Sequence, residues 1–215
     1  MPRMTADQMQ LGDVLLLKDI GETTHRFIAA AQAVLSHGWN RSSSITHAGL
    51  YGTANTILEA SGSGHGLQAK ALDEKPGHYH FEVYRWRDAE LAYRAAYWAE
   101  VLISQREHMP GFGGYSKSGA ASSLFRSSDA KSGAQAQNRA LQNALLTFDI
   151  DAVQGQRDYY CSGFVVECYV MATSAGAKPP IDLDYRFVSP KRLHGELNKG
   201  GRGWSHPGHI IAGQM

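Results

Sequence analysis

The chain has 215 residues, 43% of them hydrophobic and 19% charged, with a formal net charge of +1. This length and composition suit a globular protein with a substantial core and exclude a disordered or fibrous chain. A net charge so close to zero gives no electrostatic basis for binding nucleic acid or an anionic membrane surface, so we expect neither partner.

The layout of the chain predicts one domain made in the cytoplasm. Residues 1–10 have no apolar core of signal-peptide length, and no segment is long and apolar enough to be an integral membrane segment. We therefore expect cytoplasmic synthesis without Sec-type export, and export by a specialised secretion system stays open. No repeat or shift in composition marks a second domain, which predicts a single domain over residues 1–215.

The first elements predict a strand, a helix and a β-hairpin. Residues 11–17 form a turn and then an apolar run that is typical of a short strand buried on both faces. Residues 22–37 carry apolar side chains at helical spacing. Two alternating segments, 44–51 and 56–61, flank a short turn and predict a hairpin.

The predicted hairpin brings a histidine near a carboxylate. His47 and Tyr51 share one face of the first strand, and Glu59 lies on the returning strand, so His47 and Glu59 are expected to be cross-strand neighbours or near neighbours. A carboxylate beside an imidazole orients the ring and stabilises its protonated form. Each residue alone is compatible with a purely structural role, and only the pairing points to chemistry.

Other histidines and glycines give weaker signals. The glycine-rich residues 62–66 lack the Gly-Lys-Ser/Thr ending of a phosphate loop and are interpreted as a flexible turn. His78 with His80, and His206 with His209, could each contribute two metal ligands, but no third ligand is suitably spaced. We expect no metal and no cofactor.

Three further regular elements are predicted outside the hairpin. Residues 78–86 alternate as a third strand, and residues 88–107 form the longest helical pattern, with Asp88 as its cap. Residues 185–193 are interpreted as a short strand that leads into a helix capped by Ser189, with proline at its first position.

The segment 104–158 is predicted to hold a long insertion or lid. Residues 109–133, which include Tyr115, are rich in glycine and serine and are interpreted as irregular, either a lid over a site or a tolerated insertion. A helical pattern follows over residues 135–147.

A thiol heads the predicted helix that begins at Cys161. Apolar residues recur from Cys161 at helical spacing on one face, and the helix is expected to end near Gly176. The first turn of a helix favours thiolate over thiol and can stabilise an oxyanion through its N–H groups. Cys168, two turns along, is about 10 Å away, so both thiols should be free, and Cys168 should be plain core.

The order of these motifs resembles the circularly permuted, YiiX-like branch of the papain-like, NlpC-type cysteine hydrolases. The matching residues are Gly12 to Leu16 (GDVLL), His47 to Tyr51 (HAGLY), Leu58 to Ala60 (LEA), Tyr160 to Val165 (YCSGFV), and Ser189-Pro190 with Leu193. The departures are the long 104–158 segment and Gly163-Phe164, where many relatives carry an acidic residue and a leucine. The resemblance implies an α+β, permuted papain-like/NlpC-like fold: a small antiparallel β-sheet or half-barrel packed against helices that include a buried cysteine helix.

The resemblance also implies a catalytic triad. Cys161 would be the nucleophile, His47 the general base and acid, and Glu59 the residue that orients His47. The further candidates for substrate binding are Tyr51, Tyr115, Tyr160 and Ser162.

Three classes of function stay open. The resemblance favours a cysteine peptidase or amidase that cuts cell-wall peptides through a thioester. Some signal-less relatives are similar to toxins delivered between bacteria, which would bring an immunity or secretion partner. A lipid acyltransferase or thioesterase of the lecithin:retinol acyltransferase-like type is the alternative, although those relatives usually carry a second histidine where this chain has Glu59. A non-catalytic binding module is the third, and retention of all three triad residues argues against it.

Overall fold

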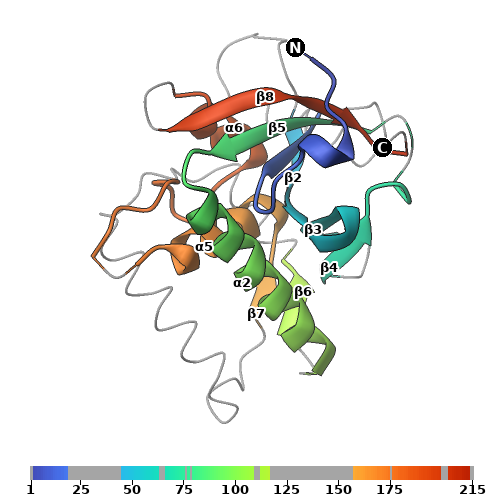
Figure 1. Cartoon of the computed structure of the whole chain (residues 1–215). Coiled ribbons are helices and arrows are strands. Elements are labelled where there is room, and N and C mark those ends of the chain that lie inside the picture. Colours follow the sequence, from blue (N-terminus) through green and yellow to red (C-terminus); the bar gives the residue numbers. More distant parts are fainter. Residues whose placement is uncertain are drawn as a thin grey trace, which may run out of the picture.

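The computed structural model describes residues 2–18, 45–62, 66–75, 77, 79–108, 112–116, 157–174, 176–199 and 203–213. Within these residues the protein is α+β, with a six-stranded antiparallel sheet and three α-helices (Figure 1). The predicted α+β class with an antiparallel sheet is confirmed. The predicted helices at 22–37 and 135–147, and most of the 104–158 insertion, lie outside the described residues.

The elements have the following bounds. In spatial order, the strands of the sheet are β4 (Gly66–Ala71), β3 (Thr56–Ser61), β2 (Ile45–Gly52), β1 (Val14–Lys18), β5 (His80–Trp86) and β8 (Trp204–Ile211). A separate parallel pair joins β6 (Phe112–Tyr115) to β7 (Arg157–Tyr159). The helices are α2 (Ala89–His108), α5 (Cys161–Ala172) and α6 (Pro190–Leu197), with short 3-10 turns η1 (Ala6–Gln8) and η2 (Thr53–Asn55).

Strand β1 lies inside the sheet, between β2 and β5. Its first four residues are all buried, as the continuous apolar run predicted. The predicted hairpin is also confirmed as β2, η2 and β3, and the predicted third strand as β5. The sequence of β1 is a continuous apolar run because both faces of this strand are buried.

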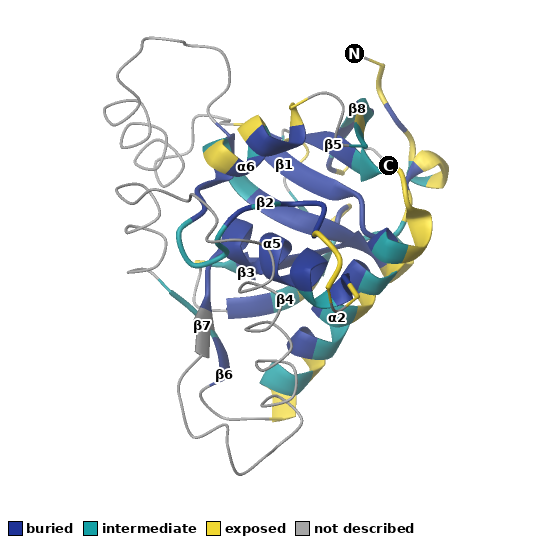
Figure 2. Ribbon diagram, turned by 90° about the vertical axis from the view of Figure 1, so that its left-hand side faces the viewer, coloured by how far each residue is buried: buried dark blue, intermediate teal, exposed yellow. Residues whose placement is uncertain are grey.

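The centre of the sheet is buried on both faces. On one face, Val14, Leu16 and Leu50 pack with residues of α2 and α5. On the other face, Leu15 and Leu17 belong to a second apolar cluster that includes Met4 and Met9, which flank η1. Figure 2 shows α5 as a buried helix between the sheet and α2, while α2 keeps an exposed side.

Helix α2 begins where its cap was predicted. The Asp88 carboxylate accepts a hydrogen bond from Leu91 N at 3.1 Å, which satisfies one of the free N–H groups of the first turn. Its buried stripe is rich in alanine, including Ala92, Ala95 and Ala99. Small side chains let α5 approach α2 closely, which helps to bury the cysteine helix.

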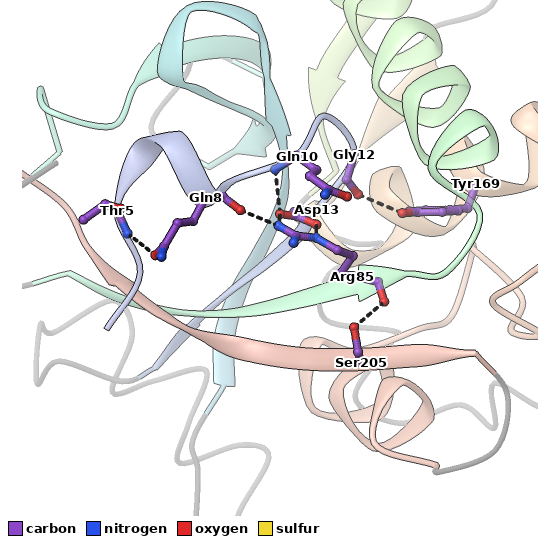
Figure 3. A network of polar contacts seen from close by, with 8 residues as sticks. All are labelled: Thr5, Gln8, Gln10, Gly12, Asp13, Arg85, Tyr169 and Ser205. Carbon is purple, nitrogen blue, oxygen red and sulfur yellow. Dashed lines mark hydrogen bonds and ion pairs between the residues drawn. The ribbon is translucent and has the colours of Figure 1, made fainter. Parts of the chain in front are cut away.

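A polar network holds β1, β5 and α5 together at the start of β1 (Figure 3). Arg85 of β5 makes two hydrogen bonds to the Asp13 carboxylate, at 2.9 and 2.6 Å. Tyr169 of α5 donates to Gly12 O at 2.7 Å. Gly12 has a φ of +84°, and a Cβ there would lie 2.1 Å from Ala92 O, so glycine is required. The network therefore fixes α5 against the sheet.

Helix α5 differs from its prediction in burial and in length. All of its residues except Met171 are buried, whereas the spacing predicted one buried face. The sheet and α2 cover it so fully that even its polar residues Ser162 and Glu167 are buried. It ends at Ala172 and not near Gly176, and the Thr173 hydroxyl donates to Tyr169 O at 2.7 Å at that end.

The sequence prediction missed strands β4 and β8. β4 begins at Gly66, in the segment interpreted as a flexible turn, and β8 contains Pro207 and Gly208. Proline is tolerated in β8 because that strand lies at the edge of the six-stranded sheet. Both segments have weak strand propensity, and pairing with β3 and β5 decides their structure.

Two other local predictions were wrong. Residues Phe112–Tyr115, expected to be irregular, form β6 and pair with β7, a contact between distant segments that no local pattern reveals. The strand expected from Tyr185 is a turn, in which Phe187 N donates to Asp184 O. The helix after it is confirmed as α6, with the Ser189 side chain accepting from Arg192 N at 3.2 Å.

Candidate active site

The site begins at the N-terminus of α5, where Cys161 is the first helical residue. Tyr160, the preceding cap residue, has an extended conformation, so the chain turns into the helix directly at the thiol. Cys161 is only 5% exposed. A buried sulfur at the positive end of a helix is placed where a thiolate is stabilised.

Strands β2 and β3 separate beside this thiol. Their pairing covers Leu50–Gly52 with Thr56–Leu58, and the earlier part of β2 pairs with β1 on its other side. The backbone of Ala48 is therefore free of β3 and hydrogen-bonds the Cys161 sulfur at the start of α5. The backbone of Ser162 does the same. The start of α5 is thus bound to the part of β2 that carries His47.

His47 and Glu59 are hydrogen-bonded across the hairpin. His47 Nε2 lies 2.7 Å from Glu59 Oε2, which confirms the predicted neighbourhood. From the Leu50–Leu58 pair, Glu59 falls level with Gly49, and His47 is the next residue of β2 on the same face. A Cβ on Gly49 would lie 2.6 Å from Ile57 Cγ1, so a glycine at this position allows the close approach.

The imidazole links the carboxylate to the thiol. His47 hydrogen-bonds Cys161 as well as Glu59. Because Nε2 is engaged with Glu59, Nδ1 is the ring nitrogen left for the sulfur. The three side chains form a continuous chain from sulfur to carboxylate, although β2, β3 and α5 contribute one residue each.

The electrostatics favour a thiolate–imidazolium pair. Burial alone would lower the pKa of His47, but the charges and hydrogen bonds of Cys161 and Glu59 raise it to about 10. Burial alone would raise the pKa of Cys161, but His47 and the backbone of Ala48 and Ser162 lower it. At neutral pH the proton therefore belongs on the imidazole.

Glu59 has two partners that the sequence did not identify. Its Oε1 accepts from Gln68 Nε2 at 2.7 Å and from Lys75 Nζ at 2.5 Å. Burial alone would raise the pKa of Glu59, but His47 and Lys75 lower it to about 2. Gln68 lies on β4, directly opposite Glu59, and Lys75 lies in the turn after it. Both were missed because β4 itself was not predicted.

Two of the four predicted substrate-binding residues have hydroxyls that bond the segment before α6. Tyr160 donates to Tyr185 O at 2.6 Å and accepts from Val188 N at 2.9 Å. The Ser162 hydroxyl donates to Val188 O at 2.6 Å. These bonds hold the segment against the start of α5, so both hydroxyls support the site's walls.

The other two predicted residues lie at different places. Tyr51 packs in the second apolar cluster, and its hydroxyl is 3.4 Å from Asn55 Oδ1. Tyr115 lies on β6 against Gly62, where a Cβ would be 3.2 Å from the tyrosine ring. Burial and the charge of Cys161 raise the pKa of Tyr115, which places its phenol near the sulfur. Substrate contact by any of the four stays a prediction.

The second cysteine and the histidine pairs are separate from this site. Cys161 and Cys168 are both free thiols, as predicted, and Cys168 is fully buried in the core. His80 and His209 stack with their rings 6.4 Å apart, while His78 lies outside the described residues. Among the residues that the structure describes, no group of three or more His, Cys, Asp or Glu side chains is arranged to hold a metal ion.

Comparison of the chain with protein-family models, with curated proteins and with solved structures found no match. In the described part of the chain, no helix has the length and apolar character needed to cross a membrane. The observations that bear on function are therefore the geometry of the Cys161 site and the motifs in the sequence.

Proposed function

We propose that the protein is a cysteine hydrolase that cleaves an amide bond through a thioester, with Cys161, His47 and Glu59 as its triad. The observation that carries the proposal is the hydrogen-bonded chain from the Cys161 sulfur through His47 to the buried Glu59 carboxylate. A structural cysteine does not need a raised-pKa imidazole beside it, whereas a nucleophile does.

The first half of the reaction forms a thioester. The Cys161 thiolate attacks the carbonyl carbon of the substrate, and N–H groups at the start of α5 can stabilise the resulting oxyanion. His47, already protonated, transfers its proton to the leaving amine as the C–N bond breaks. Glu59 keeps the ring oriented throughout through its 2.7 Å bond to Nε2.

The second half releases the acid. His47, now neutral, takes a proton from a water molecule that attacks the thioester carbonyl. The C–S bond breaks, the carboxylic acid leaves, and the thiolate–imidazolium pair is restored. Both halves use the same three side chains, so no cofactor is needed in this scheme.

The fold and substrate belong to the same proposal. The strand that carries His47, β2, belongs to the antiparallel sheet and precedes the cysteine helix α5, which packs against that sheet. This order supports the permuted papain-like arrangement implied by the motifs. By the same resemblance, the substrate class that we propose is the peptide part of the bacterial cell wall. The resemblance to signal-less relatives is likewise the basis for proposing delivery between bacteria, with an immunity or secretion partner.

A substrate survey with matched variants tests the proposal. Wild type, Cys161→Ala and Cys168→Ala are incubated with cell-wall fragments, peptides and lipid esters, and the products are identified by mass spectrometry. We expect free peptides from cell-wall fragments with wild type and Cys168→Ala, and none with Cys161→Ala. Acyl transfer to a lipid acceptor would identify the alternative chemistry, and turnover by Cys161→Ala would refute the assigned nucleophile.

A further inference from the structure

The Glu59 carboxylate is enclosed by donors on both of its oxygens. Its side chain is fully buried, and Lys75, at 2.5 Å from Oε1, is only 11% exposed. Gln68 Nε2 supplies a second donor to Oε1 at 2.7 Å. A buried carboxylate needs such compensation, because an unpaired charge in the interior is strongly destabilising.

The charges alternate along the site when the cysteine is a thiolate. Cys161 is then negative, His47 positive, Glu59 negative and Lys75 positive. Without Lys75, the Cys161 thiolate, the His47 imidazolium and the Glu59 carboxylate would together carry one net negative charge. With Lys75, the Glu59–Lys75 pair is neutral whether or not the His47 proton has been transferred.

The turn that carries Lys75 is held firmly. Two i to i+3 hydrogen bonds close it, Glu74 N to Ala71 O and Lys75 N to Leu72 O. Leu72 is fully buried in the second apolar cluster, and its backbone bonds both Asn55 O, before β3, and Gly213 N, after β8. The backbone of Lys75 is therefore fixed relative to β3, which carries Glu59.

We propose that Lys75 is a positioning residue of the active site, which with Gln68 holds Glu59 ionised and aimed at His47 Nε2. It acts through Glu59 and does not touch the substrate. This role rests on the proposed function, since it makes Lys75 a support for the Glu59 of the same triad.

Alkylation of Cys161 by iodoacetamide tests the role without any substrate. The rate of alkylation is measured against pH, and mass spectrometry separates label on Cys161 from label on Cys168. Among the described residues, the charged groups of the site are His47, Glu59 and Lys75, and the phenols of Tyr115 and Tyr160 are further titratable groups that interact with the charge of Cys161. The low-pH midpoint of the profile reports how strongly this set favours the thiolate.

Lys75→Met should move that midpoint upward by about one pH unit, because Glu59 then protonates more easily and stabilises the imidazolium less. Lys75→Arg keeps the cation and should restore the wild-type midpoint. Gln68→Leu removes only a neutral donor and should cause a smaller shift in the same direction. Lys70→Met, the same change at a position of β4 that is paired with Ile57 and not with Glu59, is the matched control and should cause none.

An unchanged midpoint in a folded Lys75→Met protein would overturn the inference, since a purely structural lysine would alter stability alone. Should Lys75→Met fail to fold, Lys75→Gln keeps a donor without the charge and must show the same upward shift. Because alkylation needs no substrate, the pH midpoints of the variants can be interpreted even if no amide hydrolysis is found. Equally, an absent shift would leave the Cys161 hydrolase proposal intact.

Discussion

Two buried glutamates of the sheet have nearly the same partners, yet only one of them adjoins a thiol. The Glu59 site comprises Glu59, His47, Lys75, Gln68 and Cys161, and the Glu82 cluster comprises Glu82, His194, Lys18, Tyr84 and Asn198. Each carboxylate contacts one histidine, one lysine and one neutral donor. Burial alone would raise the pKa of each, and the partners instead lower both to about 2.

The difference lies in what the histidine touches next. His47 uses its second nitrogen for Cys161, whereas His194 Nε2 is shared between Glu82, at 3.1 Å, and the Asn198 amide, at 2.8 Å. The cations also differ, since Lys18 is 48% exposed and Lys75 is 11% exposed. A carboxylate–histidine–lysine set is therefore no sign of catalysis by itself. In the Glu82 cluster it fastens α6 to β5 and β1.

The largest contrast is expected at the thiol. Cys161→Ala should lower amide hydrolysis by about a thousandfold or more, because no other group can form the thioester. Cys168→Ala is the control and should keep its activity, since Cys168 is core. Initial rates on the substrate found in the survey measure both. Full activity in Cys161→Ala would mean that the Glu59 site is no more catalytic than the Glu82 cluster.

Neutralising each glutamate tests the comparison directly. Glu59→Gln should reduce activity by about a hundredfold or more, because His47 loses the charge that stabilises its protonated form. Glu82→Gln should leave activity within about threefold of wild type. Both should lower the free energy of unfolding by about 1–3 kcal/mol, as urea denaturation would measure. Equal losses of activity in the two variants would contradict the separation of roles.

Acid unfolding should depend on both carboxylates. Each has a pKa lowered from 4.5 to about 2, so its contribution to stability is present above pH 4.5 and is lost as the pH falls through 2. His47 has the opposite sign: its raised pKa stabilises the fold below pH 6.5, and this contribution is lost as the pH rises through about 10.

Unfolding free energies measured from pH 2 up to about pH 10, where His47 loses its proton, check these signs. Glu59→Gln and Glu82→Gln should each flatten the acid limb, whereas His47→Gln should flatten the alkaline limb. An acid limb unchanged by either glutamate variant would mean that the carboxylate has no lowered pKa in the folded protein.

The smallest effect is expected at the cap of α6. Ser189→Ala removes the hydrogen bond from Arg192 N and should cost about 1 kcal/mol of stability. Because α6 supplies His194 to the Glu82 cluster, activity at Cys161 should not change. Thermal unfolding with parallel alkylation rates measures both, and slower alkylation of Cys161 would show that α6 also supports the thiol.

The local pattern predicted those parts of the site that lie on strongly patterned elements. His47 and Glu59 are on a hairpin whose alternation is clear, and Cys161 heads an apolar helix. Gln68 and Lys75 could not be found in this way, because β4 has weak strand propensity and forms through pairing with β3. A faint signal was present in the alternation of Leu67, Ala69 and Ala71 with polar residues.

The sequence by itself determined the β1 core strand, the hairpin, helix α2 and the cap of α6, since each depends on spacing within one segment. The α+β class was implied by the resemblance of its motifs to a known family. Only the tertiary structure decided that β2 separates from β3 beside Cys161, that α5 is buried on every side, and that Lys75 reaches Glu59. These features depend on contacts between residues far apart in the chain, whose free energy is gained only when the segments meet. The thiol's pKa, and with it the chemistry proposed for this protein, belongs to that second group.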